Sequence, residues 1–304
     1  MKMPFKILKD IIAKQDFFSP GHNLCAGCGA AQIARIVMKV VEKDSIVINP
    51  TGCMEVSTTT YPWTAWKVPY IHVAFENAAA VASGIRSAYD ALIMKKKLGK
   101  DVNVVVLGGD GGTADIGLQA LSGAFERGDR ITYICYDNEA YMNTGIQRSG
   151  ATPYNAWTTT TPAGQRTLKK DLMGIAITHR VKYAATASIA YLLDATNKVE
   201  KAISMNGPSF IHWLQPCTIG WRYDPKLTVK LSRLAVKTGL WPLYEYYDGV
   251  TKLTVQVPKR VPVSEYLKPQ GRFRHIMDNP NELVKIQSYA DEIAAKFGLG
   301  PVAE

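Results

Sequence analysis

Four of the five cysteines lie in short loops where their thiols could hold a metal centre. Cys25 and Cys28 form a C-x-x-C pair before an expected helix, and Cys53 and Cys217 each follow an expected strand. Four thiolates suit either tetrahedral zinc or a [4Fe–4S] cluster, and the spacing with only one close pair leaves both open. A redox-active C-x-x-C pair would leave Cys53 and Cys217 without a role. The fifth cysteine, Cys135, lies in an apolar run and is predicted to be a core residue.

A glycine-rich turn with an aspartate is the second group of residues that could do chemistry. Residues 108–113 (GGDGGT) follow the apolar run 102–107, and Asn138 lies just past the apolar run 131–136. Glycines at the carboxyl end of a strand let backbone N–H groups approach phosphate oxygens, next to a helix N-terminus. Asp110 and Asn138 would add two hard oxygens, which together with a diphosphate suit Mg²⁺. Alone, the turn is also compatible with a tight connection in which the aspartate caps the helix.

The pairing of Gly109-Asp110-Gly111 with Asn138 resembles the signature of thiamine diphosphate enzymes. The resemblance implies that Asp110 and Asn138 bind Mg²⁺ through their side chains and that Ala140 adds its backbone carbonyl. It also implies that the diphosphate lies against the turn that contains Gly109, Asp110, Gly111 and Gly112. One departure is visible, because Asp137 stands where the general signature prefers a first asparagine.

Longer blocks of the chain resemble the β subunit of pyruvate:ferredoxin oxidoreductase and its 2-oxoacid relatives. These blocks are residues 51–84, 108–128, 136–153 and 207–222, and the resemblance spans about residues 18–275. It implies that Asn143 is a catalytic residue that contacts the thiazolium side of the cofactor and the bound 2-oxoacid. It also implies that one [4Fe–4S] cluster, next to thiamine diphosphate, is held by Cys25, Cys28, Cys53 and Cys217.

The activity implied by this resemblance is oxidative decarboxylation of pyruvate to acetyl-CoA and CO₂, with electrons passed through the cluster to ferredoxin. A branched-chain 2-oxoacid is an alternative substrate. Oxalate is another, and it would give two CO₂ without coenzyme A. Two more distant alternatives are a thiamine decarboxylase or carboligase subunit without a cluster, and a zinc-stabilised scaffold.

The resemblance also implies partner subunits. Thiamine catalysis needs a glutamate from a pyrimidine-binding domain, and no such domain is evident in this sequence. We therefore expect an α subunit to supply that glutamate, so the isolated chain should be inactive. A ferredoxin-like cluster subunit or domain and an external ferredoxin would carry the electrons onward, and coenzyme A would take the acyl group.

The elements that must position these residues alternate along the chain. Apolar, strand-like runs are expected at 45–49, 71–74, 102–107, 131–136, 183–186 and 209–214, and helices at 30–42, 76–94, 116–127, 168–177 and 189–205. This alternation predicts an α/β fold with a mostly parallel sheet and helices on both faces, the fold of a diphosphate-binding half. We expect residues 1–222 to form the domain that binds thiamine diphosphate, Mg²⁺ and the cluster. Residues 223–304, with a last helix at 281–297, are expected to be a C-terminal extension that packs on this domain or on a partner.

Composition excludes several other classes of protein. The formal net charge is +10, yet the longest basic run, at residues 95–97, has no interleaved aromatics, so no nucleic-acid partner is expected. No apolar run approaches the roughly 18 to 20 residues of a membrane span. The first 15 residues are amphipathic and lack the apolar segment of a signal peptide, and the cysteine count is odd. We therefore expect a cytoplasmic protein that does not associate with membranes.

Overall fold

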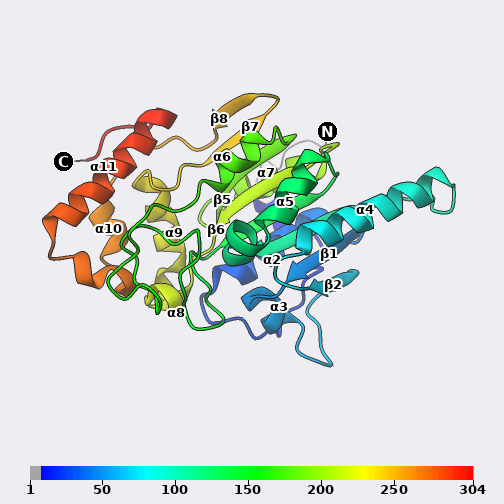
Figure 1. The fold of residues 1–304 in the computed structure, drawn as a ribbon, viewed down its shortest axis with the longest axis horizontal. Coiled ribbons are helices and arrows are strands. Elements are labelled where there is room, and N and C mark those ends of the chain that lie inside the picture. The colour runs from blue at the N-terminus through cyan, green and yellow to red at the C-terminus, as the bar shows by residue number, and fades with distance from the viewer. Residues whose placement is uncertain (1–7, 304) are drawn as a thin grey trace.

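The computed structural model describes residues 8–303, so the first seven residues of the N-terminal segment considered above lie outside it. Its centre is one eight-stranded sheet with the strand order β2-β1-β3-β4-β6-β5-β7-β8 (Figure 1). The first six strands in sequence run parallel to one another. They are β1 (Ser45–Pro50), β2 (Tyr70–Val73), β3 (Asn103–Gly109), β4 (Thr132–Asp137), β5 (Tyr183–Ser188) and β6 (Ser209–Leu214). The predicted parallel α/β sheet is confirmed, with strand ends shifted by up to two residues.

Helices cover both faces of the sheet, and the strands divide their side chains between them. One core contains α2 (Gly29–Val41) and α7 (Leu192–Ile203) with strand residues such as Val105 and Ile134. The other contains α4 (Ala78–Met94), α5 (Leu118–Glu126) and α6 (Leu172–Thr178) with Val104 and Cys135. Adjacent strand residues thus enter opposite cores, as the two-residue period of a strand requires. Cys135 is fully buried, which confirms the prediction that it is a core residue.

The register of the central strands brings three connecting loops together. Gly109 at the end of β3 pairs with Tyr136 of β4, and Asp137 of β4 pairs with Leu214 of β6. The residues that follow these strands therefore start from one level at the carboxyl edge of the sheet, where α/β folds bind their ligands. Two further helices begin at this edge, namely α3 (Cys53–Thr58) and α8 (Thr218–Trp221).

Residues beyond 222 have more structure than the single helix expected there. They form α9 (Thr228–Lys237), α10 (Val263–Leu267) and α11 (Pro280–Phe297), and a hairpin of β7 (Tyr244–Tyr247) and β8 (Val250–Leu253). The hairpin continues the sheet, with β7 antiparallel to β5. The three helices share a third core with Leu214 and Trp221, so they pack against the carboxyl edge of the sheet, whereas Tyr244 of the hairpin lies in the second core. In residues 8–303, no helix is both long enough and apolar enough to cross a bilayer.

Candidate functional site: an oxygen site beside four thiols

The glycine turn after β3 forms one wall of the site. Asp110 is only 1% exposed, and the chain after it forms a π-helix, Gly112–Ile116, an irregularity frequent at functional sites. A Cβ on Gly111 would lie 2.3 Å from the ring of Tyr141, so only glycine fits there. The Tyr141 hydroxyl donates to Asp115 (2.9 Å) and thereby fastens the loop after β4 to the turn after β3. The two loops that carry Asp110 and Asn138 are therefore held against each other.

Three polar groups meet at this point. One polar atom of the Asn138 amide lies 2.7 Å from the carbonyl oxygen of Ala140 and 3.0 Å from Oδ1 of Asp110. Both Asn138 and Ala140 are buried, at 5% and 4% exposure. With the amide oxygen in this position, the other two oxygens lie 2.7 and 3.0 Å from it. That spacing matches the roughly 3 Å edge of an octahedron whose metal–oxygen bonds are about 2.1 Å, which is the geometry of Mg²⁺.

The Asp110 carboxyl group forms no ion pair with a cationic side chain in the part of the chain that the structure describes. Its oxygens accept hydrogen bonds from the backbone N–H of Asn138 (3.3 Å) and from the hydroxyl of Ser149 (2.5 Å). Burial, with the nearby charge of Asp137, raises the pKa of the Asp110 carboxyl well above its usual value. A bound cation would stabilise the ionised form of this carboxylate.

The neighbouring carboxylate, Asp137, is neutralised within the protein. It binds Lys169 (3.0 Å) and His212 (2.8 Å), and Lys169 also binds Glu139 (3.0 Å), whose other oxygen binds Arg272 (2.6 Å). Burial alone would raise the pKa of Asp137, but the charge of Lys169 and the hydrogen bond from His212 lower it to about 2. Two adjacent strand ends thus carry one compensated and one uncompensated carboxylate.

The four cysteine thiols lie together at the same edge, three of them at helix N-termini. Cys28 is the N-cap of α2, Cys53 is the first residue of α3, and Cys217 is the N-cap of α8, where its sulfur accepts from the N–H of Gly220 (3.3 Å). Backbone N–H groups and helix dipoles at such positions favour thiolates.

The pKa values of the thiols reflect their burial and their proximity to one another. Burial, then the neighbouring thiols Cys217 and Cys25, raises the pKa of Cys28 to about 12, and burial with the same neighbours raises that of Cys53 to about 12. Across residues 8–303, no three His, Cys, Asp or Glu side chains surround a single point at the distances of one metal ion. The thiols therefore form an open group at one edge of the sheet.

Gln215 lies between the thiols and the oxygens. It follows β6, is 1% exposed, and its Nε2 donates to the carbonyl of Pro216 (3.0 Å) and faces Sγ of Cys28 (3.5 Å). Its Oε1 lies 3.1 Å from the second polar atom of the Asn138 amide. One buried side chain therefore contacts both groups.

Asn143, expected to contact cofactor and substrate, lies on the exposed part of the loop after Ala140. Its side chain makes no hydrogen bond to any residue that the structure describes. It is therefore free to contact a ligand.

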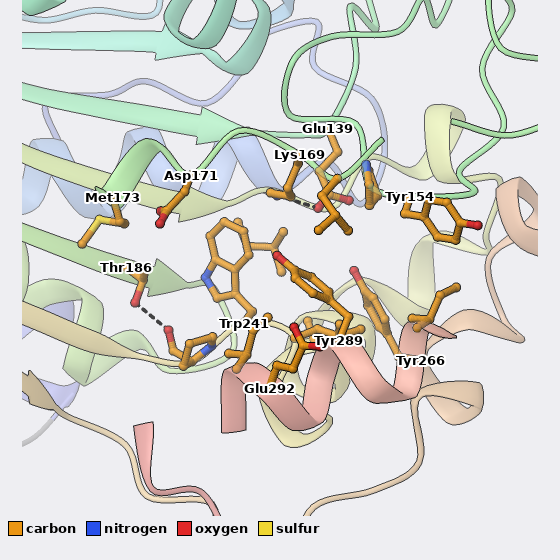
Figure 2. A pocket seen from close by; sticks show the side chains of 18 of the residues that line it. Glu139, Tyr154, Lys169, Asp171, Met173, Thr186, Trp241, Tyr266, Tyr289 and Glu292 are labelled. Carbon is orange, nitrogen blue, oxygen red and sulfur yellow. Dashed lines mark hydrogen bonds and ion pairs between the residues drawn. The ribbon is translucent and has the colours of Figure 1, made fainter. Parts of the chain in front are cut away.

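A separate cavity of about 750 Å³ lies under the C-terminal elements. Trp241, Tyr266 and Tyr289 line it, and Figure 2 shows Lys169 and Glu139, joined by an ion pair, along the side nearest the strand ends. Asp110 and the four clustered cysteines do not line this cavity. Lys169 and Glu139 therefore belong both to the lining of the cavity and to the ion pairs around Asp137.

The sequence motifs point to the cysteines, Asp110, Asn138 and Ala140, and the structure brings them to one edge. No motif marks the residues that support them, namely Gln215, Ser149, Lys169 and Arg272. A signal existed only for Gln215, which stands two residues before a candidate ligand cysteine.

Comparison with known proteins agrees with this arrangement. Residues 50–213 match the family model of the C-terminal, cofactor-binding domain of thiamine pyrophosphate enzymes. The chain is 55% identical to pyruvate synthase subunit PorB of Methanocaldococcus jannaschii, over 94% of this chain and 98% of that protein. It is 46% identical to ketoisovalerate oxidoreductase subunit VorB of Pyrococcus furiosus, over 91% of each chain. Among solved structures, the 2-oxoglutarate:ferredoxin oxidoreductase of Magnetococcus marinus matches with a TM-score of 0.58 and 21% identity, over 76% of this chain and 82% of that one, which shows a shared fold.

Proposed function

Because the chain belongs to the family of β subunits of 2-oxoacid:ferredoxin oxidoreductases that includes pyruvate synthase subunit PorB, we propose that it is the subunit of such an enzyme that binds thiamine diphosphate, and that the enzyme's substrate is pyruvate. The observation that carries the proposal is the set of oxygens from Asp110, Asn138 and Ala140, which lies beside four thiols at one edge of the sheet.

The oxygen site fits Mg²⁺ with a diphosphate. Its protein ligands would be the Asp110 carboxylate, the Asn138 amide oxygen and the Ala140 carbonyl, and phosphate oxygens would complete the shell. The N–H groups of the glycine turn lie at a helix start, where they can donate to the same phosphates. Thiamine diphosphate supplies the carbon nucleophile that a 2-oxoacid needs for decarboxylation, and the chain positions it.

The thiols fit an iron–sulfur cluster. Cys25, Cys28, Cys53 and Cys217 would each bind one iron of a [4Fe–4S] cluster, and the N–H of Gly220 donates to one of the sulfurs. Such hydrogen bonds stabilise the negative charge that a reduced cluster carries. Asn143, exposed beyond Ala140, would contact the substrate. An α subunit would supply the activating glutamate, and a ferredoxin-like subunit with an external ferredoxin would take up the electrons.

The test begins with anaerobic purification of the chain together with its co-purifying subunits. Iron, sulfide, zinc, magnesium and thiamine diphosphate are then measured per chain. We expect about four irons assigned to this chain, one thiamine diphosphate, and bleaching of the cluster absorbance on addition of pyruvate. Zinc in place of iron, with no thiamine diphosphate, would overturn the proposal.

The same preparation identifies the substrate. Pyruvate, a branched-chain 2-oxoacid and oxalate are supplied in turn, with and without coenzyme A, and reduction of ferredoxin is followed. We expect the highest kcat/KM with pyruvate and a requirement for coenzyme A. Turnover of the branched-chain acid alone, or of oxalate without coenzyme A, would reassign the substrate while leaving the cofactors in place.

A further inference from the structure

We propose that Gln215 is a positioning residue that holds the Asn138 amide in its metal-binding orientation. Through Cys28 it also links that amide to the four clustered cysteines. The inference rests on the proposed function, because it concerns how the chain prepares the oxygen site for Mg²⁺. It adds a residue that belongs to neither ligand set.

The orientation of Gln215 is fixed by its own partners. Its Nε2 donates to the Pro216 carbonyl (3.0 Å) and faces Cys28 Sγ (3.5 Å). Turning the amide over would place Oε1 against the Pro216 carbonyl oxygen, and two buried acceptors would then face each other. The backbone gives no freedom either, because the N–H of Gln215 donates to the Asp137 carbonyl (2.8 Å). Gln215 therefore presents an acceptor, Oε1, to Asn138.

This acceptor makes the two orientations of the Asn138 amide unequal. With its nitrogen toward Gln215, the Asn138 amide places that nitrogen 3.1 Å from Oε1, an acceptor, and turns its oxygen toward Asp110 and Ala140. With its nitrogen toward Asp110 and Ala140, it donates to two acceptors, Oδ1 of Asp110 (3.0 Å) and the Ala140 carbonyl oxygen (2.7 Å), but sets its own oxygen against Oε1. In either orientation one side has oxygen against oxygen. A cation between Asp110, Asn138 and Ala140 removes this conflict in the first orientation only.

Gln215 thus favours the arrangement that a cation needs. Without it, the amide would turn and donate to Asp110 and Ala140, and that closed arrangement would have to break before a metal could bind. At the other end of the Gln215 amide, the Nε2–H beside Cys28 favours added negative charge on the four clustered cysteines. One side chain therefore influences both the Mg²⁺ affinity and the reduction potential of the neighbouring cluster.

The test compares Gln215→Leu with Gln215→Glu in the complete complex. Leucine removes both contacts, whereas glutamate keeps an acceptor toward Asn138 in either protonation state. Isothermal titration calorimetry at fixed thiamine diphosphate gives the half-saturating Mg²⁺ concentration, and a redox titration gives the midpoint potential of the cluster. For Gln215→Leu we expect a roughly tenfold higher Mg²⁺ requirement, the equivalent of one lost hydrogen bond, and a lower potential. For Gln215→Glu we expect a Mg²⁺ requirement within about threefold of the parent protein.

Two controls separate positioning from a general loss of structure. Thr228→Val removes a hydrogen bond to the same cysteine loop, from Oγ1 to the Gly27 carbonyl (2.8 Å), without touching Asn138, and should leave the Mg²⁺ requirement unchanged. In an Asn138→Asp background either side-chain oxygen can bind the cation, so Gln215→Leu should no longer weaken Mg²⁺ binding.

The outcomes distinguish this inference from the proposed function. If the parent complex binds neither thiamine diphosphate nor iron, the proposed function fails. If the parent binds both and Gln215→Leu needs no more Mg²⁺, or Gln215→Glu needs as much as Gln215→Leu, the role of Gln215 is refuted while the function stands. A Thr228→Val variant that shifts the Mg²⁺ requirement as much as Gln215→Leu would also refute it.

Discussion

The same substitution at two neighbouring strand ends should have opposite effects on stability. Asp110 and Asp137 are both buried carboxyl groups, but only Asp137 has an ion-pair partner, Lys169, and a hydrogen bond to His212. Changing each to asparagine therefore replaces a carboxyl group without an ion-pair partner in one case and removes half of an ion pair in the other. The pair of variants tests whether the Asp110 charge is present for a ligand or for the fold.

Asparagine can replace Asp110 without breaking its hydrogen bonds. Its amide oxygen can still accept from the N–H of Asn138, and its nitrogen can donate to the Ser149 hydroxyl. Replacing a buried carboxyl group that has no cationic partner should leave the cofactor-free protein as stable as the parent, or up to about 2 kcal/mol more stable. Asp137→Asn leaves Lys169 with one carboxylate instead of two and should cost about 3 kcal/mol.

Cofactor binding should follow a different order from stability. Asp110→Asn removes the only formal charge among the three expected Mg²⁺ ligands, and we expect a loss of about 3 kcal/mol, or roughly a hundredfold, in Mg²⁺-dependent thiamine diphosphate binding. Chemical denaturation in EDTA measures the first effect, and calorimetric titration with cofactor measures the second. An Asp110→Asn protein that is destabilised as much as Asp137→Asn, or that binds the cofactor normally, would refute this account of the site.

Two further predictions concern the cluster and the C-terminal segment. Cys53→Ser should lose most of the iron, as measured by iron analysis, while its thiamine diphosphate affinity stays within about threefold of the parent. Cys135→Ser should keep its iron but lose about 1–3 kcal/mol of stability in chemical denaturation, because Cys135 lies in the core. Loss of both cofactors in Cys53→Ser would show misfolding instead. Arg272→Gln should weaken cofactor binding about tenfold because its partner Glu139 stands between two expected Mg²⁺ ligands, whereas Arg260→Gln, which breaks a pair with Asp291 in the same segment, should lower stability only. Equal cofactor affinity in the two arginine variants would contradict this.

The site could be predicted from the sequence where residues that can bind a ligand directly follow expected strands. Asp110 and Asn138 could be placed together because each follows an apolar run, and parallel strands end at one edge. The pattern in residues 223–304 was weaker: α9 and the β7–β8 hairpin lie among prolines and lysines without a clear period, so only the last helix was expected. The strands and main helices within residues 8–222 were thus predictable from hydrophobic periodicity. The structure of the C-terminal segment depends on packing against the edge of the sheet, which has no local signal in the sequence.

The supporting residues of the site could not be found in this way, because tertiary register sets their contacts. Lys169 reaches Asp137 across an irregular loop, and Gln215 meets Asn138 only because β6 lies directly beside β4. No local pattern marks either contact. A motif search finds the groups that would bind a ligand, whereas the groups that orient them depend on which strand is the neighbour.

The C-terminal segment is structurally part of the oxygen site. Glu139 stands between Asn138 and Ala140 with a φ of 71°, a left-handed conformation that is uncommon for a non-glycine residue. Arg272 supports this conformation through an ion pair with the Glu139 carboxylate (2.6 Å), and its guanidinium group packs 3.9 Å above the ring centre of Trp221. The indole N–H of Trp221 in turn donates to the Asn138 carbonyl (2.8 Å). Two contacts from Arg272 therefore converge on the residues that present oxygens to the cation, so a chain truncated after residue 222 would lack one support of that loop even if its sheet still formed.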